Sequence, residues 1–414
     1  CKLAGIERLT PDNVDLEDMD VWRSIRDDTT GIFQWSSNSA QQYIRKFMSD
    51  RTIEIAKRKS PNFSMLKWMS FGNGLLRPAC ASYRDDVAEG NFADNGFKEL
   101  NDFLAPEAGH VCMQESIMMF LVKFCGYTQA ESDSVRRAIA KKKGTETLLP
   151  EIERRFIDYS STHYDISAEK CAEVIKPFLQ TILDASSYAF SWNHSDAYSA
   201  IGYICGYLRY YYPYEFITAA LNAFSDDEEQ RTAITEYADA HNIRIMSPRF
   251  GVSKDRYYFN KERKMIAKGL ASVKYMSASV ANDLFTIADG YKGDSFLNLL
   301  RRIKSETAID SRQIDSLIKI DYFQQFGNSA ELLRLVDIMD FFKNGTAKTI
   351  RKEKLNSQMA SFIAAHGTDK GAKGAELKSY TITDMDGLLH DLEDYIMGLH
   401  LPELPFRTRA KNQK

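Results

Sequence analysis

The 414-residue sequence lacks any long hydrophobic run. Its longest nearly pure apolar stretch covers residues 117–122 and ends at Lys123, whereas a membrane-spanning helix needs roughly 20 apolar residues. Proline and glycine are also sparse, at 10 and 22 residues, so collagen-like and linker-rich chains are excluded. The sequence therefore predicts no membrane span and no fibrous structure.

Cysteine is scarce, and its spacing fits neither a metal site nor a disulfide framework. The six cysteines include no C-x-x-C pair, and no His/Cys cluster has the spacing of zinc ligands. Scattered cysteines in a long chain favour reduced, buried thiols in a cytosolic protein. No signal peptide is recognisable, and the sequence starts at Cys1 rather than Met, so we expect a piece of a longer protein.

An excess of charge of one sign is missing as well. The sequence has 54 Lys and Arg against 57 Asp and Glu, a net charge of −3, which excludes a wholly basic nucleic-acid binder. A local basic surface is still compatible with this balance. The apolar content of 44% is enough for large cores and excludes a disordered chain, and the length predicts two or three domains.

Apolar residues at helical spacing dominate the first two hundred positions. They predict helices over residues 38–60, 115–126, 128–143 and 168–185, and Thr128 with Glu131 forms a capping box. Further helices are expected over 215–224 and up to about residue 241, then strand-like alternation over 243–259 and short helices over 269–326. The last seventy residues predict a linker and one helix near 385–399. The predicted fold class is mainly α and multi-domain.

A basic helix is the sharpest local feature. Val135 and Ile139 share one face, while Arg137 and Lys141 lie one turn apart on another. Such a row of cations suits repeating phosphates, and the alternative is a solvated basic face near a helix C-terminus. The cations considered for phosphate binding here are Arg136, Arg137, Lys141 and Lys142.

An aromatic-rich segment over residues 188–214 contains a second candidate site. Asn193 is expected to cap a helix, which places His194 in the first turn, where backbone N–H groups can bind an anion. The alternatives are that His194 only caps the helix and that the tyrosines pack rather than stack on bases.

An acidic pair, Asp27 and Asp28, precedes Thr-Thr-Gly31. It could bind a metal, or it could belong to a turn that ends a helix and leads into a strand. The sequence contains no nucleophile–base constellation, P-loop or dinucleotide fingerprint.

The order of several segments resembles one family, the replicative bacterial DNA polymerase III alpha subunit. The segments are DTTGIFQWS at 28–36, GLLRPA at 74–79, GHVCMQESIM at 109–118, GYTQAESDSVRRAIAKKK at 126–143, YAFSWNHSDAYSAI at 188–201 and YPYEFITAAL at 212–221. Residues 269–277 and 317–327 look like the family's tandem helix-hairpin-helix module, which grips the duplex backbone. The resemblance covers roughly residues 1–335.

The resemblance implies a domain order and a function. Residues 1–224 would be helical polymerase fingers with the end of the palm, 225–335 a small α+β little-finger segment and a tandem helix-hairpin-helix-like module, and 336–414 a linker and C-terminal helical segment. The chain would be the fingers and duplex-binding part of a DNA-directed DNA polymerase, a nucleotidyltransferase. Its nucleotide or DNA-phosphate contacts would be Arg136, Arg137, Lys141, Lys142 and His194, with Arg77 as a further candidate.

Catalysis by this family depends on palm aspartates that lie before the DTTG segment and hold Mg²⁺. No residue of this sequence is therefore expected to be catalytic or a metal ligand, and the chain alone is expected to be inactive. Departures from the family pattern include Trp192 in place of Lys, and Tyr275 and Ser277 in place of hairpin glycines. They leave an alternative open, a non-catalytic DNA-binding or replisome-scaffold protein derived from such a polymerase.

The expected partners are template-primer DNA, dNTP, the sliding clamp and other replisome subunits, in the cytoplasm of a bacterial or phage-infected cell. The family often carries a Q-x-x-hydrophobic-F clamp-binding segment, and Gln358 and Phe362 have this spacing. Ser361 stands where a larger apolar residue is expected, so an ordinary helix surface is the alternative.

Overall fold

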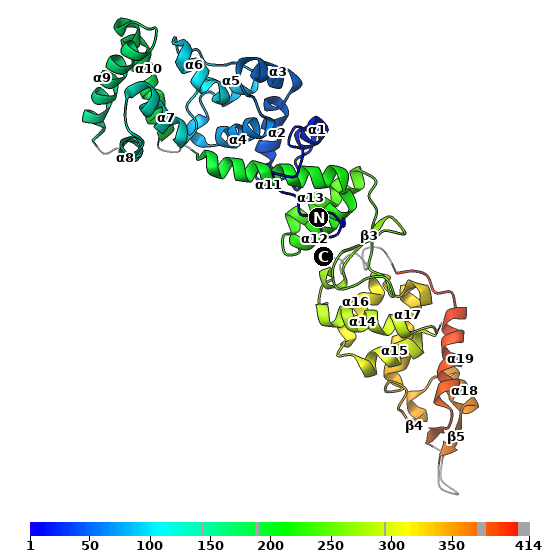
Figure 1. Cartoon of the computed structure of the whole chain (residues 1–414). Coiled ribbons are helices and arrows are strands. Elements are labelled where there is room, and N and C mark those ends of the chain that lie inside the picture. Colours follow the sequence, from blue (N-terminus) through cyan, green and yellow to red (C-terminus); the bar gives the residue numbers. More distant parts are fainter. Residues whose placement is uncertain (142–143, 187–189, 294, 371–377, 405–414) are drawn as a thin grey trace. The chain divides into compact units, whose positions relative to one another are not determined.

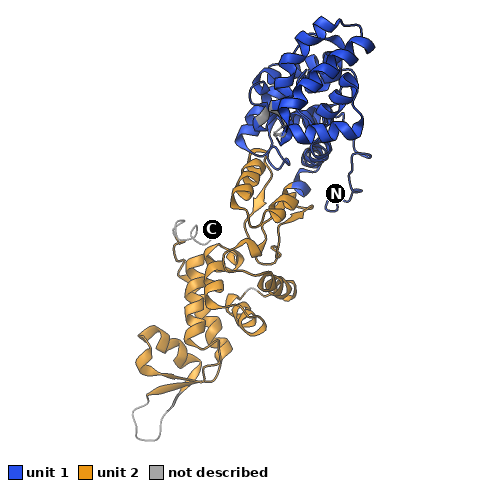
Figure 2. Ribbon diagram, turned by 90° about the vertical axis from the view of Figure 1, so that its left-hand side faces the viewer, with its two compact units in different colours: residues 1–216 blue, residues 217–414 orange. Residues whose placement is uncertain are grey.

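A computed structural model describes the chain except residues 142–143, 187–189, 294, 371–377 and 405–414 (Figure 1). The chain divides into two compact units, residues 1–216 and 217–414, which Figure 2 distinguishes by colour. Helices dominate both units, which confirms the predicted mainly α, multi-domain fold. The three domain boundaries expected from the sequence stay a prediction. No described helix is long and apolar enough to cross a membrane.

The first unit is helical and has two aromatic-rich cores. One core packs Trp22, Phe47 and Trp68, and the other packs Phe120 and Phe156. Its helices are α1 (Met19–Asp27), α2 (Asn38–Phe47), α3 (Asp50–Lys59), α4 (Met65–Leu75), η1 (Pro78–Cys80), α5 (Arg84–Ala88), α6 (Lys98–Leu104), η2 (Ala105–Glu107), α7 (Gln114–Cys125), α8 (Gln129–Ala140), α9 (Thr145–His163), α10 (Ala168–Ser186) and α11 (Trp192–Tyr211).

Local capping residues explain where several of these helices begin. The Thr128–Glu131 capping box is present at α8, as predicted. The single helix expected over 38–60 is wrong, because the Ser49 hydroxyl accepts a hydrogen bond from the Thr52 N–H and starts α3 as a separate helix. The N-cap expected at Asn193 is also wrong, because α11 already begins at Trp192 and its N-cap is Ser191.

The second unit begins within α12 (Pro213–Ala223) and continues with α13 (Glu228–Ala240). A small sheet follows, in which β3 (Met265–Ala267) pairs in parallel with β1 (Ile245–Met246) and antiparallel with β2 (Tyr258–Asn260). Helices that contribute to its main core include η3 (Leu270–Ser272), α14 (Ala278–Gly290), α15 (Phe296–Glu306), α16 (Ser311–Lys319), η4 (Gln324–Phe326) and α17 (Ser329–Phe341).

The expected C-terminal linker is instead folded. An antiparallel sheet in the order β4-β6-β5 consists of β4 (Thr349–Arg351), β6 (Ser379–Ile382) and β5 (Gly367–Lys370), and it lies beside η5 (Lys352–Lys354) and α18 (Ser357–Ala365). The strands are three or four residues long, too short to show an alternating pattern in the sequence. The last helix, α19 (Met385–Gly398), has the predicted position.

Candidate functional site

The first turn of α11 is capped by a carboxylate from another helix. The Ser191 hydroxyl donates to Oε1 of Glu115 (2.6 Å), and the backbone N–H of Trp192 donates to Oε2 (2.9 Å). Glu115 lies in the first turn of α7, so one negative charge already faces the positive end of the α11 dipole. His194 is in the first turn, as predicted, and is exposed.

The residue before this turn, Phe190, is fixed by backbone hydrogen bonds to the start of α7. The Phe190 N–H donates to the Cys112 carbonyl (3.3 Å), and the Gln114 N–H donates to the Phe190 carbonyl (2.9 Å). These two bonds form a short parallel bridge between Met113 and Phe190. The aromatic ring of Phe190 is therefore held at the junction of α7 and α11.

Cationic and aromatic side chains from three separate segments gather around Phe190. The Arg77 guanidinium lies 4.4 Å from the centroid of the Phe190 ring, and its buried Nε has no hydrogen-bond partner within the described part of the chain. Tyr198 lies 6.5 Å from Phe190, 6.2 Å from His194 and 5.3 Å from Phe33. We call these five residues the aromatic–cation cluster.

The basic helix α8 reaches the same place through Gln114. Nη1 of Arg136 donates to the Gln114 side-chain oxygen (3.1 Å), and Nη2 donates to Asp133 (2.8 Å). Asp133 also pairs with Arg137 (2.7 Å). The side chain of Arg136 is 16% exposed and that of Arg137 is 67% exposed, so Arg136 holds helices together while Arg137 faces solvent. Lys141 is exposed at the end of α8.

The structure thus brings together only part of the predicted residue set. Arg77 and His194 lie in one cluster, and Arg136 joins it indirectly, whereas Lys142 lies outside the described residues. Sequence reasoning missed Phe33, Phe190 and Gln114, although all three belong to segments that resembled the family. The nucleotide-binding or DNA-phosphate-binding role of these residues stays a prediction.

The acidic pair before Gly31 has a structural role. Arg209, a buried residue of α11, donates to the carbonyls of Thr30 (2.7 Å), Ser24 (2.8 Å) and Asp28 (2.6 Å). The Asp28 carboxylate accepts the Thr30 N–H (2.7 Å), and Gly31 has a φ of +71°. The segment is a turn, as expected, but it leads into a further turn rather than a strand.

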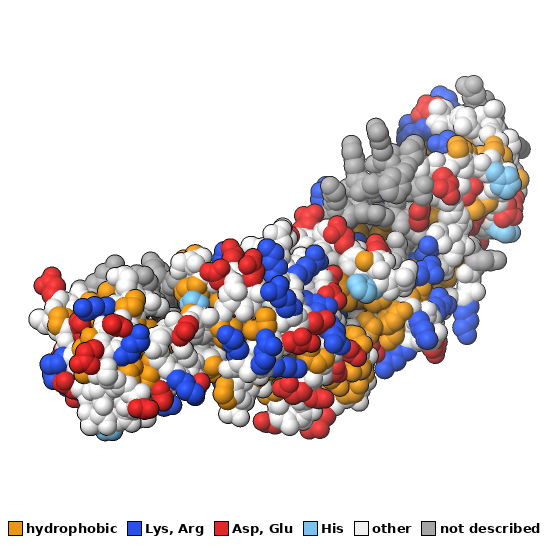
Figure 3. Space-filling model, turned by 90° about the horizontal axis from the view of Figure 1, so that it is seen from above, with side chains coloured by type: hydrophobic (Ala, Val, Ile, Leu, Met, Phe, Trp, Pro, Cys, Tyr) orange, Lys and Arg blue, Asp and Glu red, His pale blue; other side chains and the backbone are white. Residues whose placement is uncertain are grey.

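No metal centre emerges from the residues that the structure describes. Nowhere in that part of the chain do three His, Cys, Asp or Glu side chains come together as possible metal ligands. Lys and Arg are instead intermixed with Asp and Glu over the face shown in Figure 3.

Comparison with known proteins adds to this geometry. Residues 2–162 match the bacterial DNA polymerase III alpha subunit finger domain. The chain resembles DNA polymerase III alpha. It is 26% identical over 317 residues to DNA polymerase III subunit alpha of Halalkalibacterium halodurans, 24% over 319 residues to that of Bacillus subtilis and 26% over 339 residues to that of Treponema pallidum. These matches cover 75–80% of this chain but only 26–28% of the relatives' length.

One departure from the DNA polymerase III alpha pattern is accommodated by a nearby lysine. Trp192 stands where the family pattern has Lys, and the Lys67 ammonium lies 4.8 Å from its ring centroid. Lys67 also pairs with Asp196 at 2.5 Å. A cavity of about 510 Å³ borders these side chains. Lys67 of α4 therefore places a positive charge beside position 192, where the family pattern has a lysine.

The same cavity reaches a buried carboxyl group. Glu107 is 2% exposed and accepts hydrogen bonds from the backbone N–H groups of Cys112 (2.6 Å) and Met113 (3.1 Å) and from the Ser116 hydroxyl. Burial raises the pKa of Glu107 to about 7, and these hydrogen bonds oppose the rise. Glu107 thereby fixes the N-terminal end of α7, whose first two residues are Gln114 and Glu115.

The second unit has a left-handed backbone position in the segment that resembles the family's hairpin. Tyr275, which replaces a glycine, has a φ of +71°, and its carbonyl accepts a hydrogen bond from the Gln313 side chain (2.8 Å). Lys274 and Arg312 lie 5.1 and 5.4 Å from the Tyr275 ring centroid. Ser277 caps α14. Tyr275 thus adopts a left-handed conformation without being glycine, with two cations beside its ring.

The segment considered for clamp binding is part of α18. Gln358 is exposed, whereas Phe362 is half-buried and its ring centroid lies 5.4 Å from that of Tyr395 in α19. Both Gln358 and Phe362 line a cavity of about 220 Å³. Phe362 packs against the main core of the second unit, so its ring is only partly accessible to a binding partner.

Proposed function

We propose that the chain is the fingers and duplex-binding part of a replicative DNA-directed DNA polymerase of the DNA polymerase III alpha type. In this role it binds the incoming dNTP and template-primer DNA, within the cytoplasm of a bacterial or phage-infected cell. The observation that carries the proposal is the aromatic–cation cluster, because its residues come from three segments that each resemble the family.

Each cation would have a different role in binding, which depends on the residues that it contacts in the structure. Arg77 rests on an aromatic ring rather than a carboxylate, so its charge is available to a phosphate. Arg137 would exchange Asp133 for a phosphate oxygen, and Lys141 would extend the same positive surface along α8. Arg136 would position Gln114 and the bridge to Phe190. His194, an exposed member of the cluster, would donate a hydrogen bond to the triphosphate.

DNA binding by α8 can be tested through its salt dependence. Each lost phosphate contact should reduce the slope of log affinity against log salt by about one unit. We expect the double variant Arg137→Ala/Lys141→Ala of the whole chain to bind template-primer DNA with a reduced slope. The pair Arg154→Ala/Lys176→Ala, taken from α9 and α10, is the control of equal charge. An unchanged slope in the α8 variant would remove these side chains from the DNA surface.

Catalysis is assigned to residues outside this sequence. Phosphoryl transfer needs metal ions positioned between the attacking and leaving oxygens, and basic side chains alone do not activate a 3′-hydroxyl. We therefore expect the purified chain to show no primer extension in the presence of Mg²⁺. Extension at a rate near that of a complete DNA polymerase III alpha subunit would contradict this assignment and place the catalytic carboxylates here.

The alternative function is a non-catalytic DNA-binding or scaffold protein derived from such a polymerase. The observation that favours it is Trp192, which occupies the position of a family lysine and is covered by Lys67. DNA binding without any binding of dNTP would decide for this alternative. Binding of both ligands would decide against it.

Clamp binding through Gln358 and Phe362 is part of the proposal, and it requires Phe362 to become exposed. Phe362 would have to leave Tyr395 to enter an apolar pocket on a clamp, so burial lost in one place would offset burial gained in the other. In a synthetic peptide of residues 354–365, Phe362 has no contact with Tyr395 to lose, and we expect this peptide to bind the clamp. No binding at high micromolar concentration would end this part of the proposal.

A further inference from the structure

A cationic groove of about 730 Å³ lies in the first unit, and none of its lining residues belongs to the aromatic–cation cluster. It is bordered by α2 and by residues between the end of α4 and the start of α5. Three cations line it, Arg45, Lys46 and Arg84, against a single carboxylate, Asp85. The remaining lining residues are polar or apolar: Ser37, Ser39, Gln42, Tyr43 and Leu76.

The charges of this groove are largely uncompensated. Nη2 of Arg45 donates to the backbone carbonyl of Asp27 (3.0 Å). A carbonyl carries no full negative charge, so this contact does not neutralise the Arg45 guanidinium. Nε of Arg84 is 3.8 Å from Asp85, whose side chain is 85% exposed, so water weakens that ion pair. Lys46 is exposed. The groove therefore carries a net positive charge.

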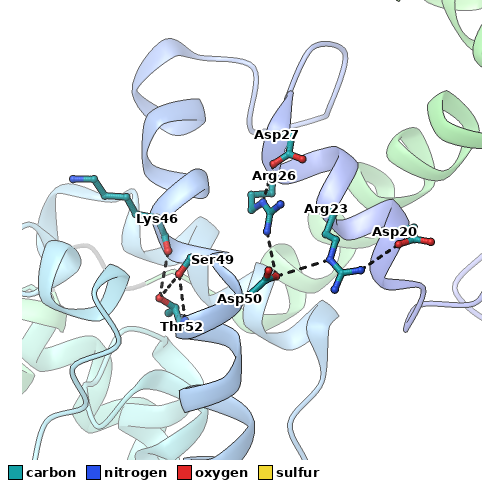
Figure 4. A network of polar contacts seen from close by, with 8 residues as sticks. All are labelled: Asp20, Arg23, Arg26, Asp27, Lys46, Ser49, Asp50 and Thr52. Atoms are coloured by element: carbon teal, nitrogen blue, oxygen red, sulfur yellow. Dashed lines mark hydrogen bonds and ion pairs between the residues drawn. The ribbon is translucent and has the colours of Figure 1, made fainter.

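Acidic residues on the neighbouring elements are already paired with other arginines, as Figure 4 shows. Asp50 contacts Nη1 of Arg26 (3.3 Å), and Asp27 contacts Nε of the same side chain (2.8 Å). Asp20 pairs with Arg23 (3.2 Å). The ammonium group of Lys46 points away from this network in Figure 4. These carboxylates therefore do not neutralise the groove.

We propose that this groove binds the sugar-phosphate backbone of single-stranded DNA. The three cations that line the groove can pair with phosphates, and the hydroxyl and amide groups of Ser37, Ser39 and Gln42 can donate further hydrogen bonds. The aromatic ring among the lining residues, Tyr43, is 7% exposed and underlies Arg84, so it offers no face to a base. Binding is consequently independent of sequence.

A single strand fits the groove better than a duplex does. The cations lie inside a concavity lined by short segments, whereas a duplex presents a broad convex surface with two phosphate rows. The inference deepens the proposed function, on which it rests for the presence of a template strand. It adds a binding site for that strand, separate from the site proposed for the triphosphate.

The test is fluorescence anisotropy with a labelled oligo-dT and the whole chain across a salt series. The variants are Arg45→Gln/Lys46→Gln and, separately, Ser39→Asp, which places a negative charge in the groove. An acidic residue in the first turn of α2 favours the helix, so Ser39→Asp keeps the fold. Lys57→Gln/Arg58→Gln in the last turn of α3 is the control of equal charge change.

We expect the Arg45/Lys46 variant to lower the salt slope by about 1.4, because two phosphate contacts on a single strand are lost. Ser39→Asp should weaken binding severalfold at low salt, and the control should match the wild type. Equal affinity and slope in all four proteins would overturn the site, and equal competition by an unlabelled duplex would overturn the preference for a single strand. Groove variants should still bind dNTP, so failure of the proposed function and failure of this inference are distinguishable.

Discussion

Among the described residues of the first unit, Glu107 and Arg209 are charged residue types that are buried, and each ties separate segments together. Arg209 is 2% exposed and holds the turn after α1 through three backbone carbonyls. Glu107 holds the N-terminal end of α7. Arg209 holds the turn that precedes Phe33, and Glu107 binds the Cys112–Met113 backbone beside Phe190, so both residues support the surroundings of the aromatic–cation cluster.

Replacing Arg209 should destabilise the first unit. We expect Arg209→Met to lower the free energy of unfolding by about 3 kcal/mol or more, because several buried charge-assisted hydrogen bonds are lost. Arg209→Lys should recover only part of that loss, since one ammonium group cannot reproduce the guanidinium fork. Urea denaturation measures both, with exposed Arg58→Met as the control. Equal unfolding midpoints for the three variants would contradict the role of Arg209.

Glu107 should make stability depend on pH. Its pKa rises from 4.5 to about 7 on folding, so the folded protein holds the proton more tightly than the unfolded chain. This contribution is complete below pH 4.5 and is lost as the pH rises to about 7, a change on the order of 3 kcal/mol. Glu107→Gln should remove it. The measurement is the difference in unfolding free energy between wild type and variant at several pH values, and a constant difference would contradict the prediction.

At the scale of elements, helix caps formed by residues close in sequence were predictable, and caps formed by residues far apart in sequence were not. The α8 capping box involves residues three positions apart, and the sequence predicted it. The cap of α11 comes from Glu115, 76 residues before Ser191, so no local pattern could reveal it. The contact between Arg77 and Phe190 likewise joins residues 113 positions apart, so no local pattern could reveal it.

The two arginines of α8 should respond differently to substitution. Arg136→Ala should lower the free energy of unfolding by about 1–2 kcal/mol, because a half-buried guanidinium that links α8 to Gln114 is lost. Arg137→Ala should leave stability almost unchanged, because its ion pair with Asp133 is exposed to water. Thermal unfolding of the single variants measures this contrast. A larger destabilisation by Arg137→Ala would reverse the assignment.

At the scale of the whole molecule, the chain has two units with separate cores. The helical character of both was predicted from apolar spacing, whereas the C-terminal sheet was not, because its strands are short and its partners lie far apart in sequence. The relatives align with 75–80% of the chain, so the account of function rests on that part. The aromatic–cation cluster lies wholly within the first unit.

Equilibrium binding of a fluorescent dNTP to the whole chain, with Mg²⁺ present, tests whether the aromatic–cation cluster binds the triphosphate. We expect saturable binding that Arg77→Gln/His194→Gln weakens about tenfold, since two charge-assisted contacts to the triphosphate are lost. The matched control is Arg154→Gln/His163→Gln, which replaces the same residue types on exposed positions of α9 and should bind like the wild type. Equal affinity in all three proteins, or no binding by the wild type, would show that the cluster is not a nucleotide site.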